Sequence, residues 1–102
     1  SLFIKNRRKF SFEGIIFVSL IINSDFSINK NIIITTEGLP NFNLDNLKSL
    51  FCEEFITNYD KFNLDKKSSD QIISDLVKKS IRISLKLETS KKPEVKTHII
   101  RL

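Results

Sequence analysis

The segment from Ile15 to Ile22, which follows Gly14, carries no charge and is apolar apart from Ser19. A run this short, rich in Ile, Val and Phe, predicts a β-strand rather than a helix or a membrane span. Successive side chains of a strand point to opposite faces, and here the odd-numbered and the even-numbered positions are both apolar. The pattern therefore predicts a central strand whose two faces are both covered by protein.

Two further segments have the character of strands. A cluster of Asn, Ser and Asp residues after the first strand predicts a long loop, which leads to a second strand at residues 32–36. Residues 14–36 are thus expected to form a β-hairpin. At the end of the chain, residues 94–102 alternate between polar and apolar and predict a third strand. This third strand could pair with either of the other two.

Between the second and third strands the apolar spacing becomes helical. Asn43 is a good N-cap, and apolar residues recur after it at i, i+3 and i+4. The main stripe is expected in the core and consists of Leu44, Leu47, Phe51, Phe55 and Phe62. A weaker second strip, either covered by a loop or offered to a partner, consists of Cys52, Ile56 and Tyr59.

A second helix is predicted from residue 70 to about residue 88, with Pro93 preventing its continuation. Ser80 and Ser84 lie within its apolar stripe, and side chains this small would let the helix approach its neighbour closely. Its other face is basic. We expect that face to be exposed to solvent and partly paired with the acidic first helix, or else to contact nucleic acid; it carries Lys78, Lys79, Arg82 and Lys86.

These elements predict an α+β fold with the order β-β-α-α-β. Two helices would pack on one face of a small three-stranded sheet. Residues 1–13 form a basic lead-in or linker end, as a short helical turn or an extended segment, and residues 14–102 form a single domain. Since two helices can cover only one face of the sheet, the other face is expected to meet a second copy or another part of a larger protein.

Composition places the chain among ordinary globular proteins. It has 102 residues, of which 40% are hydrophobic and 28% charged, enough for one modest core. A single cysteine fits a reducing compartment, and no apolar run reaches the roughly 18 residues of a membrane helix. We therefore expect a cytoplasmic domain without membrane contact. The net charge of +5 permits contact with nucleic acid without requiring it.

The sequence lacks the motifs of common catalytic and metal sites. One histidine cannot build a multi-histidine metal site, and no HExxH or CxxC motif is present. Gly14 and Gly38 stand alone, which excludes GxGxxG and Walker A loops. Cys52 lies beside Glu53 and Glu54, which would raise the pKa of its thiol, and His98 is expected at a sheet surface. We predict no catalytic, metal or cofactor residue in this chain.

Two stretches of the chain carry a family resemblance. Residues 7–20 read RRKFSFEGIIFVSL, with a double-basic segment before a glycine and an apolar strand. Residues 91–102 read KKPEVKTHIIRL, with a Lys-Pro step before a short final strand. The chain resembles the C-terminal domain of ribonuclease J. With Gly38-Leu39-Pro40 after the second strand, it is most similar to the alphaproteobacterial branch.

The resemblance implies a larger bacterial enzyme. Members of this family are metallo-β-lactamase-type ribonucleases with a β-CASP insert, which cut RNA endonucleolytically and as 5′-to-3′ exonucleases. Their zinc ligands and general base lie upstream of this domain, and none maps onto a residue of this chain. The resemblance also implies a three-stranded sheet with two helices, in agreement with the order read from the residues.

We accordingly expect an auxiliary domain that supports oligomerisation or assembly of the enzyme. Its partner would be the rest of the parent ribonuclease or a second copy, and RNA would be reached through the parent. Residues expected at the partner interface are Ile16, Val18, Leu20, Ile22, Cys52, Ile56 and Tyr59. The alternative is a direct RNA-binding module, for which the candidate contacts are Arg7, Arg8, Lys9, Lys78, Arg82 and Lys86.

Overall fold

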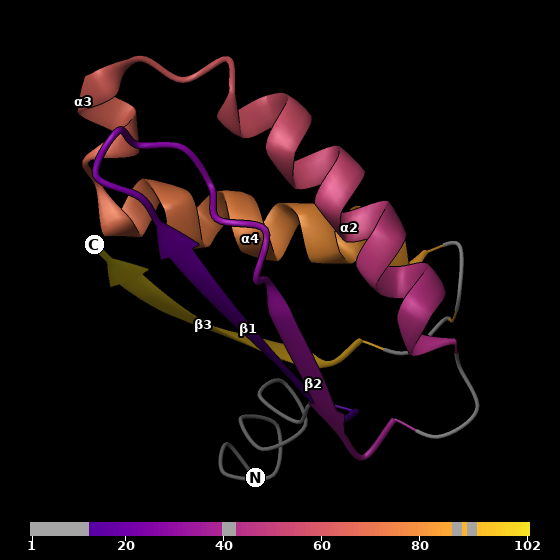
Figure 1. The fold of residues 1–102 in the computed structure, drawn as a ribbon. Coiled ribbons are helices and arrows are strands. Elements are labelled where there is room, and N and C mark those ends of the chain that lie inside the picture. Colours follow the sequence, from indigo (N-terminus) through magenta and orange to yellow (C-terminus); the bar gives the residue numbers. More distant parts are fainter. Residues whose placement is uncertain (1–12, 40–42, 87–88, 90–91) are drawn as a thin grey trace, which may run out of the picture.

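The computed structural model describes residues 13–39, 43–86, 89 and 92–102. Within this part of the chain, three strands form one mixed sheet and three helices lie beside it, which confirms the predicted α+β class (Figure 1). The N-terminal helical turn and the basic lead-in were predicted for residues 1–13, of which residues 1–12 lie outside the described ranges. In chain order, the elements are β1 (Ile15–Ile22), β2 (Ile33–Glu37), α2 (Leu44–Tyr59), α3 (Leu64–Lys67), α4 (Asp70–Leu85) and β3 (Glu94–Arg101).

β1 is the central strand, as its uninterrupted apolar character predicts. The order in the sheet is β2-β1-β3, with β2 antiparallel and β3 parallel to β1. The third strand therefore pairs with the first, the point that the sequence left open. In the register, Val18 lies opposite Ile34 on one side and Thr97 on the other. Partners in this register share a face of the sheet.

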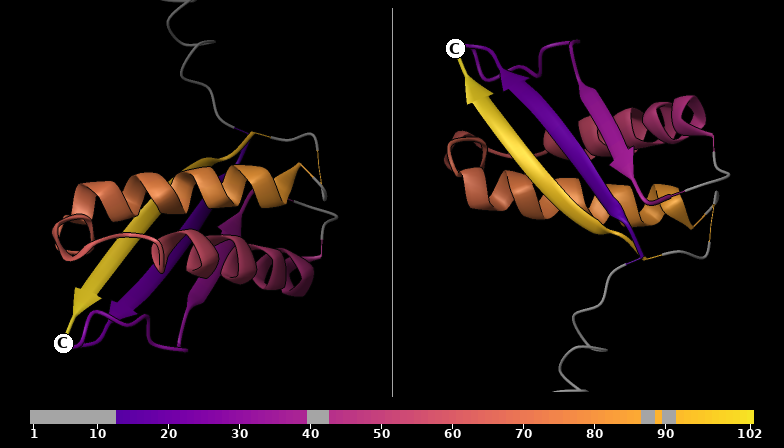
Figure 2. Two further views of the ribbon diagram at one scale, coloured as in Figure 1. Left: turned by 90° about the horizontal axis from the view of Figure 1, so that it is seen from above. Right: turned by 90° about the horizontal axis from the view of Figure 1, so that it is seen from below.

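The helices lie on one face of the sheet only, and α2 and α4 run across it side by side (Figure 2). The even-numbered side chains of β1 point into this layer and are 0–1% exposed. The stripe of α2 packs against them through Leu47, Phe51 and Phe55, and the rings of the two phenylalanines stack with their centroids 5.4 Å apart. Burying side chains of this size contributes about 1.5–3 kcal/mol each.

Each helix begins at a side chain that caps it. Asn43 accepts a hydrogen bond from the amide of Asn46 at 3.0 Å, and Ser69 accepts one from the amide of Ile72 at 3.3 Å. The short helix α3 occupies a connection for which the sequence predicted no helix. Its cap is Asn63, whose side chain accepts a hydrogen bond from the amide of Lys66 at 2.9 Å. Such caps satisfy amides that the first turn of a helix leaves without intrahelical partners.

The two serines within the apolar stripe of α4 lie in the interior. Ser80 and Ser84 are 1% and 2% exposed, and the Ser84 hydroxyl donates to the Ser80 carbonyl at 2.9 Å. Tyr59 also lies in the core, and not on the weaker surface strip to which the sequence assigned it. Its hydroxyl donates to the carbonyl of Phe26 at 2.5 Å and so ties the loop after β1 to α2.

Candidate association surface

The face of the sheet opposite the helices is not covered by any described element (Figure 2). We call it the open face. The odd-numbered residues of β1 form its middle, and the strand register places β2 and β3 side chains beside them. The open face consists of Ile15, Phe17, Ser19 and Ile21 from β1, Ile33, Thr35 and Glu37 from β2, and Glu94, Lys96, His98 and Ile100 from β3.

Apolar side chains run along the open face. Phe17 is 37% exposed, Ile33 57% and Ile100 40%, although each is a large hydrophobic residue. On the same face of β1, Ile15 precedes Phe17 and Ile21 lies beside Ile100, and both are half-buried. Single exposed hydrophobic residues are normal on a protein surface, but a contiguous patch is typical of an interaction site. The open face is therefore the strongest candidate site in the described part of the chain.

The charges of the open face are ordered along the strands. Glu37 and Glu94 flank Ile15 on its two sides, so both carboxylates lie at the end where β1 begins. Lys96 and His98 follow on β3, beside Phe17 and Ser19. The face thus has an acidic end and, beyond it on β3, a basic edge. Its two ends therefore differ in charge.

The structure corrects which side of β1 is available to a partner. The sequence assigned the partner interface to the even-numbered residues, but the helices cover them and leave them no exposed surface to offer. Both faces of β1 are apolar, so alternation alone could not say which one the helices occupy. The even-numbered residues placed in the core are Ile16, Val18, Leu20 and Ile22.

The other residues assigned to the partner interface lie in the helix layer, and of these only Ile56 is exposed. Tyr59 is buried, Cys52 is half-buried against the core, and Ile56 is 37% exposed. Burial raises the pKa of the Cys52 thiol, while the nearby Lys48 lowers it. The direction agrees with the sequence prediction, but the cause is burial and not the neighbouring glutamates.

Of the six candidate RNA contacts, the structure describes the three at α4. Arg82 and Lys86 are exposed and Lys78 is half-buried. Among the described residues, no ion pair joins these three cations to α2. Arg7, Arg8 and Lys9 lie outside the described ranges. An ion pair that the sequence did not predict joins Arg101 of β3 to Asp70 of α4 at 2.9 Å.

The described residues do not bring together a recognisable catalytic or metal site. No group of three or more His, Cys, Asp or Glu side chains among them could hold a metal ion. Cys52 lies in the helix layer, whereas His98 lies on the open face of the sheet, so the thiol has no imidazole base beside it. None of the described helices has the length and apolarity needed to cross a bilayer.

Comparison with known proteins identifies the family. A search of the curated proteins gave no match. The family model described as the ribonuclease J C-terminal domain matches residues 2–102. The match spans both stretches on which the resemblance was based, and the alphaproteobacterial branch stays a prediction. With nearly its whole length matched, the chain belongs to the ribonuclease J C-terminal domain family.

Proposed function

We propose that this chain is the auxiliary domain of a bacterial ribonuclease J and supports assembly of the enzyme by pairing its open face with that of a second copy. The observation that carries the proposal is the exposed apolar row at Phe17, Ile33 and Ile100. The parent would be a zinc-dependent ribonuclease of the cytoplasm, with its metal held upstream. Burial of apolar surface is the main driving force of such association.

The order of charges favours a second copy as the occupant and selects its orientation. If two open faces met about an axis parallel to the strands, β2 of one copy would lie over β3 of the other, and Glu37 would approach the partner's Glu94. If the axis lay across the strands, the acidic end of each face would instead lie over the far end of the partner's face, away from the partner's Glu37 and Glu94. Like charges across an interface cost free energy, so the second arrangement is favoured.

The size of the open face limits the affinity. A strand of eight residues is about 26 Å long, and three strands side by side are about 14 Å wide. Such a face lies at the small end of specific protein interfaces. We therefore expect the separate domain to form a dimer with a Kd of about 1 μM or weaker, in rapid exchange with the monomer.

The test is sedimentation equilibrium of the chain over a concentration series. A change of Phe17→Asp on the open face should weaken the dimer at least about tenfold, because it places a carboxylate in the apolar row. Ile56→Asp is the matched control, since Ile56 is also 37% exposed but lies on the helix layer. A chain that stays monomeric at every concentration, or equal effects of the two changes, would contradict the proposal.

A second candidate function is direct RNA binding through α4. Its support is the exposed pair Arg82 and Lys86, one helical turn apart and aligned with Lys78. Binding of this kind falls steeply with salt, because phosphate contacts release counterions. Charge reversal at Arg82 and Lys86 should then abolish salt-dependent binding of a single-stranded RNA. Unchanged binding by the double variant would rule out this function for α4.

A further inference from the structure

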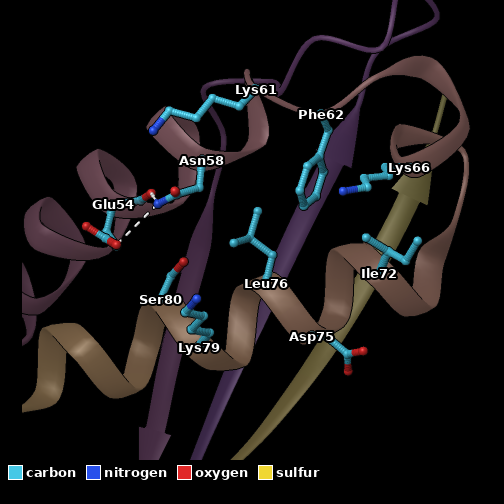
Figure 3. A pocket seen from close by; sticks show the side chains of 10 residues that line it. All are labelled: Glu54, Asn58, Lys61, Phe62, Lys66, Ile72, Asp75, Leu76, Lys79 and Ser80. Carbon is cyan, nitrogen blue, oxygen red and sulfur yellow. Dashed lines mark hydrogen bonds between the residues drawn. The ribbon is translucent and has the colours of Figure 1, made fainter.

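A groove with a volume of about 460 Å³ opens between α2, α3 and α4, on the helix layer (Figure 3). We propose that it is a binding site for a nucleotide, with the base on an apolar floor and the phosphate against a lysine at the rim. Its volume lies in the range of small-molecule sites. The groove is lined by Glu54, Asn58, Lys61, Phe62, Lys66, Ile72, Asp75, Leu76, Lys79 and Ser80.

The floor of the groove is apolar and includes an aromatic ring. The Phe62 ring and the Leu76 side chain point toward one another across it, and Ile72 lies beside them (Figure 3). The Lys66 ammonium lies 5.3 Å from the centre of the Phe62 ring. This ring therefore already holds a cation against its π-face, and a planar base could take that place. Stacking of a base on an aromatic side chain is worth about 1–3 kcal/mol.

The rim of the groove carries groups of both charges. Lys61, Lys66 and Lys79 come from three different segments and line different sides of the groove, so a phosphate at the rim would meet one of them (Figure 3). Glu54 and Asp75 supply carboxylate oxygens, which accept hydrogen bonds from hydroxyl or amino groups. The Asn58 amide donates to the Glu54 carbonyl at 2.8 Å and to its carboxylate at 3.2 Å, which holds that carboxylate in place.

A buried hydroxyl lies at the end of the groove. Ser80 is 1% exposed, and its Oγ has no hydrogen-bond partner among the described residues. Its hydroxyl points toward the side of the groove where Asn58 lies (Figure 3). Buried polar groups are rarely left without a partner, so a polar ligand atom that reached this hydroxyl would supply the partner it lacks.

The mixture of charges decides which ligand fits. An acidic peptide would be repelled by Glu54 and Asp75, and a small inorganic anion would leave the apolar floor unused. A nucleotide matches all three features, because it combines a flat base, hydroxyl and amino donors, and a phosphate. The same chemistry is offered by a free mononucleotide and by one residue of a single-stranded RNA, and the experiment below distinguishes these sources.

The test is a titration of the 102-residue chain followed by amide chemical shifts in NMR. The ligands are adenosine 5′-monophosphate, adenosine, inorganic phosphate and an oligoadenylate. We expect saturable shifts around Phe62, Ile72 and Lys79 with the monophosphate, at a Kd of about 1 mM, and weaker effects of adenosine or phosphate alone. Tenfold tighter binding of the oligonucleotide would identify an RNA strand as the source, and equal binding would identify the free nucleotide.

Three variants separate a specific site from diffuse charge attraction. Lys79→Gln should weaken binding about fivefold and Phe62→Leu about tenfold, since the first removes a phosphate contact and the second a stacking face. Lys48→Gln is the control, because Lys48 is an exposed lysine of α2 outside the groove. The proposal is overturned if no saturable shifts occur at the groove, or if Lys48→Gln weakens binding as much as Lys79→Gln does. Because the groove and the open face lie on different layers, either proposal can fail without the other.

Discussion

The two faces of β1 are made from the same kinds of residue but differ in burial. The even-numbered side chains are 0–1% exposed beneath the helices, whereas Phe17 on the other face is 37% exposed. The first set stabilises the fold of the single chain. The second set is only partly buried, and its exposed apolar surface adds nothing to the stability of that fold. An apolar strand is thus a signal of burial on both sides, but only one side need be buried within its own chain.

The comparison also separates the two edge strands. On β2, Ile34 is 7% exposed and faces the helices, while its neighbour Ile33 is 57% exposed on the open face. On β3, Val95 is 7% exposed, while Ile100 is 40% exposed. The same division therefore runs across the whole sheet. Because exposed apolar residues occur on all three strands, the open face is an extended surface and not one exposed residue.

The comparison is tested most strongly by a pair of neighbours on β1. Leu20→Ala should reduce the free energy of unfolding by about 3 kcal/mol, because it leaves a cavity in the packed core. Ile21→Ala, on the open face, should cost about 1 kcal/mol or less, because Ile21 is only partly buried. Urea denaturation of both variants measures the difference. Equal losses from the two changes would mean that the open face is covered in the folded chain.

A second pair of variants, on β2, tests whether the two faces also differ in burial at the sheet edge. Ile34→Ala should lower the free energy of unfolding by about 2 kcal/mol, since Ile34 faces the helices. Ile33→Ala should change it by less than about 0.5 kcal/mol while weakening association of two chains. Denaturation at low protein concentration, where monomers dominate, keeps the two effects apart. A large loss of stability from Ile33→Ala in the monomer would contradict the assignment of this residue to the open face.

A smaller change in stability is expected at the hydrogen bond that joins α2 to the loop after β1. Tyr59→Phe removes the hydrogen bond to the Phe26 carbonyl while keeping the ring in the core. The loss should be about 1 kcal/mol, the usual net value of such a bond. Thermal or urea unfolding of the variant measures it. Association through the open face should be unchanged, and a weaker dimer would show that the two sides of the sheet are coupled.

The smallest effect is a pH dependence at the same residue. Burial raises the pKa of the Tyr59 phenol above its usual value of 10.0. The positive charge of Arg101 opposes this shift, and the negative charges of Asp60 and Asp25 add to it. A raised pKa means that the stability contributed by the neutral phenol is present below about pH 10 and is lost as the pH rises through the folded-state pKa. Tyr59 is the one tyrosine of the chain, so phenolate absorbance reports it directly. A midpoint at or below the usual value would contradict the buried placement.

Much of the fold could be predicted from local patterns. The apolar run at residues 15–22 predicted the central strand, and Asn43, predicted as an N-cap, is found as the cap that begins α2. These predictions succeeded because strand period and helix capping depend on residues close together in the sequence. The helix α3 was missed, since a four-residue helix is too short to have an apolar period of its own.

The surface could be predicted only in part, for a physical reason. Sequence alone indicated that β1 needs cover on two sides and that two helices supply only one. It could not assign the sides, because Ile16 and Phe17 are equally apolar and only tertiary packing distinguishes them. The burial of Tyr59 and the pairing of Arg101 with Asp70 likewise depend on contacts between distant segments.

The most direct test of the account is a measurement of contacts between two copies in solution. A mixture of isotope-labelled and unlabelled chains allows nuclear Overhauser effects between copies to be selected. The account predicts such contacts from the Phe17 ring to apolar side chains of the partner's open face, and none from Ile56 on the helix layer. Contacts confined to the helix layer, or no contacts between copies at concentrations far above micromolar, would contradict it.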